Sequence, residues 1–523
     1  MKKPGEGRTM KTLRNTLMAA CAMTLAASPA LAGKDNDTFV WATSTEMDTP
    51  DLYYGNQREA LITAYAQCDS LIHRDPQTNE YQPLLATSWE WVDDKTLEMD
   101  LREGVKFHDG TDFDAQDVAD TLNHVAAPDS DMKIRVIVDW IDNVEVVDDH
   151  KVRIHAKAPT PAAFEYLSGT SPIYPAGHYD SAPEVPGADG TTRRDWGAVI
   201  PVCTGPYKLT DYKAGESLTL ELNPDYFEGS PKGKPSIGKI IYRTIKDPET
   251  QIAEVVTGGV DWIWGVPPEN AGMLNDMDNL TVVSAPTMRM SFLALDAAGR
   301  TGETPMTDVR VRQAIAHAID REAITENLVG EGSTVQKSMC VSVQFGCETD
   351  VTQYPYDPEK AKALLAEAGY PDGFELPFHA YRDRPYSEAV LNYLRAVGIK
   401  GDLQFLQWRA LRPLIVGDET QIAHLTFGSN GMLDASASTG YYFQFGPDDY
   451  ARDEEVRDWL TEAETTTDTE AREALYSKAL KKIADEAYYI PLFIYGRTYA
   501  FNKDLDYPVT PDEMAHFYLA KWK

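Results

Sequence analysis

The sequence predicts an α/β protein with mixed α+β sheets, folded into more than one lobe. Residues 96–101 and 217–222 alternate polar and apolar side chains, the pattern of strands that bury one face. Segments with helical spacing lie between and after them, so strands and helices alternate along the chain. The 523 residues exceed the ~250–300 at which a single core stops growing. Two or three lobes are therefore expected.

The clearest helix is predicted over residues 358–368. Asp357 can cap its start, Pro358 suits the first helical position, and Gly369 suits its end. Its apolar residues fall on one face, at Ala361, Leu364, Leu365 and Ala368. The same spacing predicts helices around residues 118–125, 311–318 and 475–483.

The first 32 residues have the features of a secretory signal peptide. A basic segment precedes an apolar stretch over residues 17–27, and Ala30-Leu31-Ala32 follows, so cleavage after Ala32 is predicted. The apolar stretch is shorter than the ~20 residues of a transmembrane helix, and no later segment approaches that length. Cys21 leaves lipid attachment as an alternative, which the better Ala-x-Ala site disfavours. The mature protein is expected to be soluble in the periplasm.

The chain is strongly acidic, with 82 Asp and Glu against 49 Lys and Arg and a formal charge of −33. Removing the basic leader makes the mature protein more negative still. Such a field repels nucleic acid and anionic membrane surfaces, so neither is expected as a partner. The acidity serves solubility in the simplest interpretation, and a preference for cationic ligands is the alternative.

Four cysteines follow the predicted cleavage site, an even number that indicates disulfides in an exported protein. Cys340 and Cys347 are close enough in sequence to staple one loop, and a Cys68–Cys203 pair then follows by elimination. No CxxC or HExxH spacing occurs, so a metal site is not expected.

Several phrases, in order and spacing, resemble one large protein family. They are PLLATSWE at 83–90, LREGVKFHDG at 101–110, TGPY at 204–207, NPDYF at 223–227, VRVRQAI at 309–315, AIDR at 318–321 and YDPEKA at 356–361. Together they resemble the solute-binding proteins of bacterial ABC importers for oligopeptides, dipeptides and nickel (family 5). The resemblance runs from about residue 40 to the C-terminus.

The resemblance implies a two-lobed periplasmic-binding-protein fold with a hinged cleft and an extra N-terminal domain. Lobe I would combine residues 33–76, 200–287 and 493–523; residues 77–199 would form the additional domain, and residues 288–492 lobe II. It also implies a monomer that closes on a small peptide or peptide-like solute. The partners would be the transmembrane permease and its cytoplasmic ATPase, and no cofactor is expected.

The cleft is expected to bind its solute through polar and aromatic side chains at strand ends and at the interlobe crossovers. The candidates are Thr45, Glu46, Trp264, Arg289, Arg382, Trp408, Asn430, Asp434 and Tyr441.

One departure from the family pattern bears on the solute. Where peptide binders of the family carry an aspartate for the ligand's amino group, this sequence has Met432, with Asp434 two residues later. If Asp434 takes over that role, a cationic head is still recognised. Otherwise the solute is an amino-acid conjugate, an opine-like molecule, a metal chelate, a sugar or another polar nutrient. Arg289 and Arg382 would suit a carboxylate, because guanidinium offers a bidentate fork.

Two other classes of function are possible for a chain of this kind. An exported hydrolase is disfavoured because GxSxG, HExxH, a Walker A loop and GxGxxG are all missing from the sequence, so no catalytic residue is assigned. A binding protein that signals or acts as a chaperone has the same predicted fold and stays an alternative.

Overall fold

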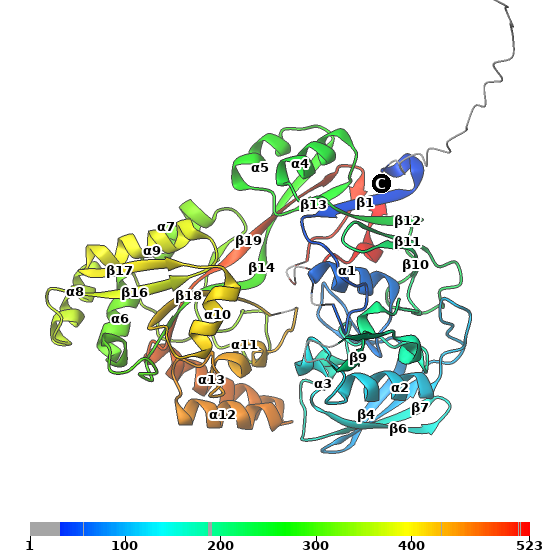
Figure 1. Ribbon diagram of the computed structural model, residues 1–523, viewed down its shortest axis with the longest axis horizontal. Helices are drawn as coiled ribbons and strands as arrows, with labels where there is room; N and C mark the ends of the chain where they lie inside the picture. Colours follow the sequence, from blue (N-terminus) through cyan, green and yellow to red (C-terminus); the bar gives the residue numbers. More distant parts are fainter. Residues whose placement is uncertain (1–31, 56, 187–190, 430, 511, 513) are drawn as a thin grey trace, which may run out of the picture.

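The computed structural model describes residues 32–55, 57–186, 191–429, 431–510, 512 and 514–523. The central element of the fold is one eleven-stranded sheet that passes through both halves of the molecule (Figure 1). Two long antiparallel strands, β14 (Leu280–Leu295) and β19 (Tyr489–Asn502), lie at the centre of this sheet and join the halves. Their pairing shifts register between Pro286 and Met290, where the chain passes from one half to the other.

The half that we call lobe I is built on β1 (Thr38–Thr43), whose six residues are all buried. β1 pairs in parallel with strands on both sides, as expected for a strand covered on both faces. The other strands here are β10 (Tyr207–Lys213), β11 (Ser217–Leu222), β12 (Lys239–Thr244) and β13 (Trp262–Trp264). The helices are α1 (Arg58–Gln67), α4 (Pro248–Thr257) and α5 (Pro268–Asn275).

An additional domain packs on lobe I around a separate four-stranded antiparallel sheet. Its strands, in spatial order, are β4 (Ala86–Asp93), β5 (Thr96–Leu101), β7 (Lys151–Ala156) and β6 (Ile141–Asp148). It also contains α2 (Ala115–Ala126), which Asp114 caps, and the short α3 (Ala163–Tyr166). Tyr53 and Leu71 belong to the same apolar core as this sheet, so this core extends into residues before 77.

The other half, lobe II, covers its part of the sheet with helices on both faces (Figure 1). Its strands are β16 (Phe374–Ala380), β17 (Ile399–Phe405) and β18 (Ile422–Gly428). Its helices are α6 (Val309–Ala318), α7 (Arg321–Ile324), α8 (Pro358–Glu367), α9 (Arg384–Ala396), α10 (Trp408–Val416), α11 (Ser436–Tyr442), α12 (Glu454–Thr465) and α13 (Thr469–Asp485).

Short strands complete the structure. They are β2 (Ile72–Arg74) with β3 (Tyr81–Pro83), β8 (Glu184–Pro186) with β9 (Thr192–Arg194), β20 (Leu505–Asp506) with β21 (Lys521–Trp522), and β15 (Thr334–Val335), which pairs with β19. In the part of the chain that the structure describes, no helix is both long and apolar enough to cross a membrane.

The local predictions agree closely with these elements. The two alternating segments form β5 and β11 with the predicted bounds, and the capped helix forms α8, where the Asp357 side chain accepts from the Lys360 amide. Both disulfides form: Cys68–Cys203, with Cα atoms 4.7 Å apart, and Cys340–Cys347, at 5.5 Å. The α/β class with mixed sheets is confirmed. The division of the chain into domains stays a prediction, since β14 and β19 run through the expected boundaries.

Candidate binding cleft

A cavity of about 220 Å³ lies where lobe I, the additional domain and lobe II meet. We call it the cleft cavity. Its wall is made by Leu52, Gly55, Gln57, Arg58, Leu61, Ile134, Ile137, Thr170, Arg289, Met432 and Met514. Residues from both lobes contribute, so its shape depends on how the lobes are arranged.

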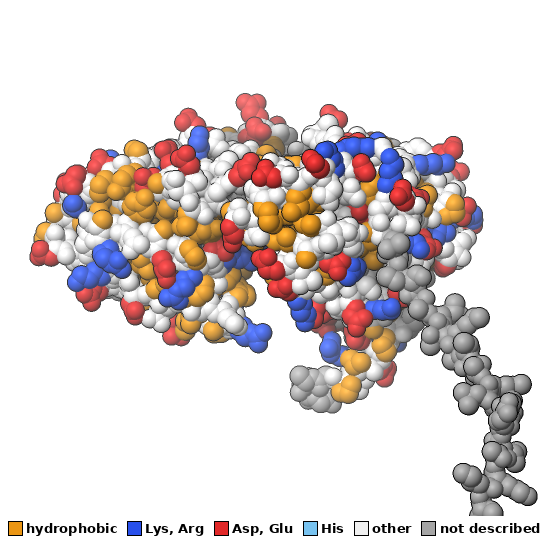
Figure 2. Space-filling model, turned by 90° about the horizontal axis from the view of Figure 1, so that it is seen from above, with side chains coloured by type: hydrophobic (Ala, Val, Ile, Leu, Met, Phe, Trp, Pro, Cys, Tyr) orange, Lys and Arg blue, Asp and Glu red, His pale blue; other side chains and the backbone are white. Residues whose placement is uncertain are grey.

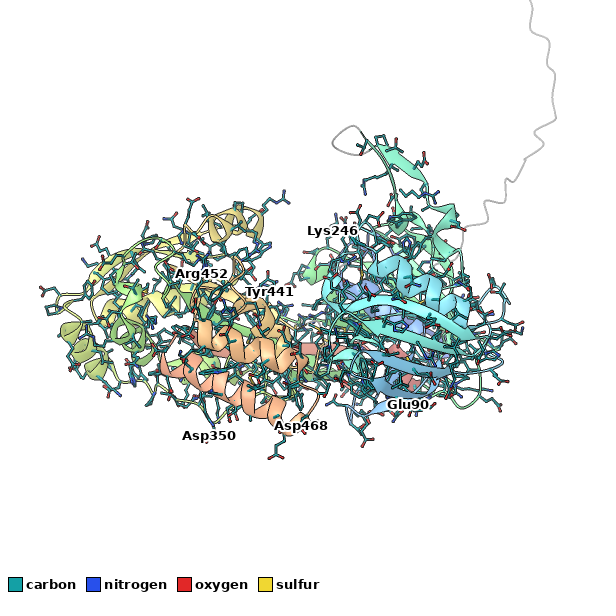
Figure 3. All side chains as sticks on the ribbon, turned by 90° about the horizontal axis from the view of Figure 1, so that it is seen from below. Glu90, Lys246, Asp350, Tyr441, Arg452 and Asp468 are labelled. Atoms are coloured by element: carbon teal, nitrogen blue, oxygen red, sulfur yellow. A yellow bond between two sulfur atoms is a disulfide. The ribbon has the colours of Figure 1, made fainter. Side chains whose placement is uncertain are left out.

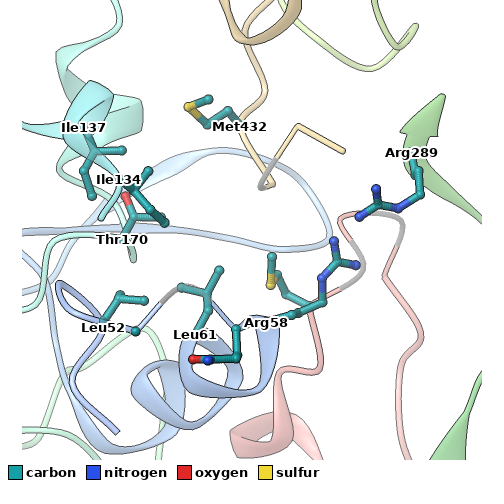
Figure 4. Close-up of a pocket in the computed structure, with 11 residues that line it drawn as sticks. Leu52, Arg58, Leu61, Ile134, Ile137, Thr170, Arg289 and Met432 are labelled. Atoms are coloured by element: carbon teal, nitrogen blue, oxygen red, sulfur yellow. The ribbon is translucent and has the colours of Figure 1, made fainter. Parts of the chain in front are cut away.

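Two guanidinium groups are the charged side chains among the described residues of the cleft cavity. Arg58 and Arg289 extend toward one another from opposite sides of it (Figure 4). None of the described residues that line it carries a carboxylate, and most of the remaining described wall is apolar. A pair of guanidiniums in such a setting favours an anion, above all a carboxylate that can accept a bidentate hydrogen bond.

The backbone positions both arginines. Arg58 is the first residue of α1, where the unpaired amides and the dipole of the helix add further positive potential. Arg289 lies on β14 opposite Gly428 of β18. A Cβ atom at Gly428 would come within 2.7 Å of the Arg289 guanidinium, so the glycine provides space for it.

A second cavity, of about 400 Å³, contains the predicted Trp264. It lies between β13, α5, the joining strands and lobe II, and Tyr386 and Tyr495 contribute to its wall. The Arg497 guanidinium lies over the Trp264 ring, 4.6 Å from its centroid. Two of the predicted site residues thus line different cavities. Arg289 lines the cleft cavity, and Trp264 lines this second cavity.

Thr45 and Glu46 line neither of these two cavities. The Thr45 carbonyl accepts hydrogen bonds from the Tyr242 and Thr244 hydroxyls. Thr45 is thereby attached to the end of β12 in the lobe I sheet. Glu46 is exposed and forms an ion pair with Lys246 at 2.5 Å. Pairs this exposed add little to stability.

Two of the predicted aromatic residues, Trp408 and Tyr441, lie on the surface of lobe II. Trp408 is 43 % exposed and lies 4.9 Å from the Tyr381 ring, and Tyr441 is 44 % exposed and stacks on Phe427 at 5.7 Å. Figure 3 shows Tyr441 and Lys246 on neighbouring edges of the two lobes. Both rings are available to a ligand larger than the cleft cavity, although neither lines it.

Arg382 and Asp434 are placed differently from what the sequence indicates. Arg382 is exposed on the turn before α9 and lines neither cavity. Asp434 is buried, and its two oxygens accept from the Arg472 guanidinium at 2.7 and 3.0 Å. The Tyr476 hydroxyl donates to the same carboxylate at 3.2 Å. This carboxylate is neutralised inside lobe II and does not face the cleft cavity; Asn430 lies outside the described residues.

Sequence reasoning did not select Arg58 or the apolar wall of the cavity. Arg58 follows Gln57 at the start of a helix whose other residues are mostly buried, and no motif marks it. The cavity draws on residues near 52–61, 134–137, 170, 289, 432 and 514, so no short stretch of sequence contains its pattern. The Met432 departure was the one local signal, and Met432 does line the cavity.

Within the described ranges, no group of three or more His, Cys, Asp and Glu side chains is arranged to hold a metal ion. The acidic character of the chain is instead spread over its surface. Figure 2 shows Asp and Glu side chains on both lobes, interspersed with Lys and Arg, on the face seen from above.

The chain is similar to known proteins over nearly all of its length. The family model described as "Bacterial extracellular solute-binding proteins, family 5 Middle" matches residues 80–450. The glutathione-binding protein GsiB of Salmonella paratyphi A is 28 % identical over 500 residues, which cover 92 % of this chain and 93 % of that protein.

Solved structures share the fold. HbpA2 from Haemophilus parasuis superposes with a TM-score of 0.79 at 23 % identity, covering 93 % of this chain and 100 % of the other. A dipeptide-binding protein from Pseudoalteromonas sp. SM9913, in complex with Met-Leu, gives a TM-score of 0.76 at 21 % identity, with the same coverage. From the match to the family model and the shared two-lobed architecture, the chain belongs to the bacterial extracellular solute-binding proteins of family 5.

Proposed function

We propose that this protein is the periplasmic solute-binding subunit of an ABC importer and that it captures a short, acidic, peptide-like solute such as glutathione. The observation that carries the proposal is the pair of guanidiniums, Arg58 and Arg289, that line the cleft cavity from its two sides. Glutathione carries two carboxylates and one amine. The name of the GsiB relatives supports the same class of ligand.

The rest of the cavity fits this class better than it fits a cationic peptide end. Met432 supplies a thioether where a carboxylate would suit an amine, and Asp434 is held by Arg472. An apolar wall also strengthens the attraction between a guanidinium and a carboxylate, because it excludes water from around them. The solute is therefore recognised mainly through its negative groups.

Capture follows from the two-sided construction of the cavity. A solute that contacts Arg58 in lobe I and Met432 in lobe II binds the closed arrangement better than an open one, and so shifts the population toward closure. The closed lobes then present a surface that docks on the transmembrane permease, whose ATPase drives release. The signal peptide delivers the protein to the compartment where this exchange takes place.

Calorimetric titration with reduced glutathione tests the proposal, with the Met-Leu dipeptide as a comparison. Arg58→Gln and Arg289→Gln should each weaken glutathione binding by roughly 10- to 100-fold, since a hydrogen bond to a charged group contributes about 1.5–3 kcal/mol. Arg382→Gln is the matched control, because it removes a guanidinium that lies outside the cavity.

Native mass spectrometry of the protein as purified provides an independent identification. A co-purified solute with two or more acidic groups supports the proposal. A stoichiometric solute without a carboxylate, or equal affinity in the Arg289→Gln and Arg382→Gln variants, would refute it.

A further inference from the structure

A buried ion pair lies at the contact between the two lobes. Arg74 is the last residue of β2, and Glu165 belongs to α3 of the additional domain. Their side chains are paired and only 8 % and 6 % exposed. The Tyr81 hydroxyl donates to the second oxygen of Glu165 at 2.8 Å. All three residues belong to the lobe I side of the molecule.

This pair also makes hydrogen bonds across to lobe II. Arg74 Nη2 donates to the Gly431 carbonyl at 2.9 Å, and Glu165 Oε1 accepts from the Leu433 amide at 2.9 Å. The two peptide groups involved flank Met432, which lines the cleft cavity. One donor and one acceptor thus hold the backbone on both sides of the residue that lobe II contributes to the cavity.

Lobe II holds the same segment from its other side. Gln344 Nε2 donates to the Met432 carbonyl at 2.9 Å, and the Phe345 amide donates to the Leu433 carbonyl at 2.8 Å. Both residues lie inside the loop closed by the Cys340–Cys347 disulfide. Residues 431–433 are therefore attached to a disulfide-closed loop of lobe II. Hydrogen bonds from lobe I to this segment hold lobe II itself.

We infer that Arg74 and Glu165 form a closure latch, a lobe I device that binds the 431–433 backbone of lobe II, holds the lobes together and positions Met432 over the solute. The use of glutathione as the solute in the tests below rests on the proposed function. Closure by the latch does not depend on the identity of the solute. The latch is reversible because its partners are backbone groups that water can solvate when the lobes part, while the ion pair stays intact within lobe I. Charge-assisted hydrogen bonds of this kind, buried in the closed state, slow dissociation more than they speed association.

The first test uses small-angle X-ray scattering of the protein without solute. Arg74→Ala/Glu165→Ala removes both charges together, so no lone buried charge remains, and it should give a larger radius of gyration than the wild type. The control Arg312→Ala/Glu486→Ala removes an ion pair whose arginine is 3 % exposed and which lies within lobe II; its radius should not change.

The second test guards against loss of folding. Exchanging the two residues, Arg74→Glu with Glu165→Arg, keeps an ion pair in lobe I but turns a carboxylate toward the Gly431 carbonyl and a guanidinium toward the Leu433 amide. Both contacts become repulsive, so the exchange should also expand the molecule. In stopped-flow measurements with glutathione, the dissociation rate should rise by at least ~10-fold, with a smaller change in the association rate.

The two proposals fail in different ways. If glutathione does not bind the wild type, the solute assignment falls while the scattering comparison still decides on the latch. If the exchanged variant is folded by circular dichroism and keeps the wild-type radius of gyration, the latch is refuted whatever the solute is.

Discussion

The two sides of the molecule each contain a buried ion pair, and the two pairs serve different purposes. The pairs are Arg74–Glu165 on the lobe I side and Arg472–Asp434 on the lobe II side. In lobe II the carboxylate is saturated by Arg472, Tyr476 and the Ser436 amide, all from the same lobe. On the lobe I side the pair also forms hydrogen bonds to backbone groups of lobe II. The role of a buried ion pair therefore depends on which third group it binds.

The two disulfides also differ between the two sides of the molecule. Cys68–Cys203, on the lobe I side, spans 135 residues, whereas Cys340–Cys347 spans seven. The chain-entropy relation then gives a cost of about 5 kcal/mol for Cys68→Ala/Cys203→Ala and about 2.5 kcal/mol for Cys340→Ala/Cys347→Ala. Urea unfolding of the two double variants, with circular dichroism as the signal, measures both. Equal losses would show that loop length does not govern them.

The lobe II ion pair predicts the next largest effect. Arg472→Gln leaves the Asp434 carboxylate buried without its main partner, and should lower the free energy of unfolding by about 4 kcal/mol. Arg472→Gln/Asp434→Asn removes the lone charge and should recover part of that loss. Thermal unfolding of both variants measures the difference. A double variant that is no more stable than the single one would contradict the account of Asp434 as an internally neutralised charge.

The lobe I side contains a carboxyl group with an unusual titration. Burial raises the pKa of Asp51 to about 7, although the Tyr179 hydroxyl and the Tyr53 amide donate to it. The folded protein therefore keeps a proton that the unfolded chain releases above about pH 4, so stability falls as pH rises from 4 to 7. Asp51→Asn should remove this dependence and gain about 4 kcal/mol over that range relative to wild type.

The check for Asp51 is a series of urea melts between pH 4 and 8. The exposed Asp94→Asn serves as a matched control and should run parallel to the wild type. A parallel curve for Asp51→Asn as well would mean that Asp51 is ionised in the folded protein.

The lobe II side has a buried base that titrates in the opposite sense. Burial lowers the pKa of His424 to about 4, and its ring is hydrogen-bonded to the Ser291 and Ser387 hydroxyls. The unfolded chain takes up a proton below about pH 6.5 while the folded protein does not, so stability is lost as pH falls from 6.5 to 4. That loss should reach about 3 kcal/mol. His424→Gln should be less stable throughout but lack this slope, which the same melts can show.

Local sequence patterns predict the parts of this protein that depend on neighbours along the chain. Period-two alternation placed β5 and β11 because each strand buries one face, and Asp357 with Pro358 placed the start of α8 because capping is local. The short Cys340–Cys347 loop follows from spacing in the same way, and the order of the phrases from residue 83 to residue 361 indicated the family that the comparisons confirm.

The side chains that line the cleft cavity are known only from the tertiary structure. Asp434 was a reasonable candidate for a cationic ligand until Arg472, 38 residues away, proved to hold it. Arg58 shows no local signal and acquires its role by facing Arg289, and Trp264 lies under Arg497 in a separate cavity. The physical reason is common to all three. Charge and burial at a site are set by which distant segments pack together, and a linear pattern contains periodicity and caps but not those contacts.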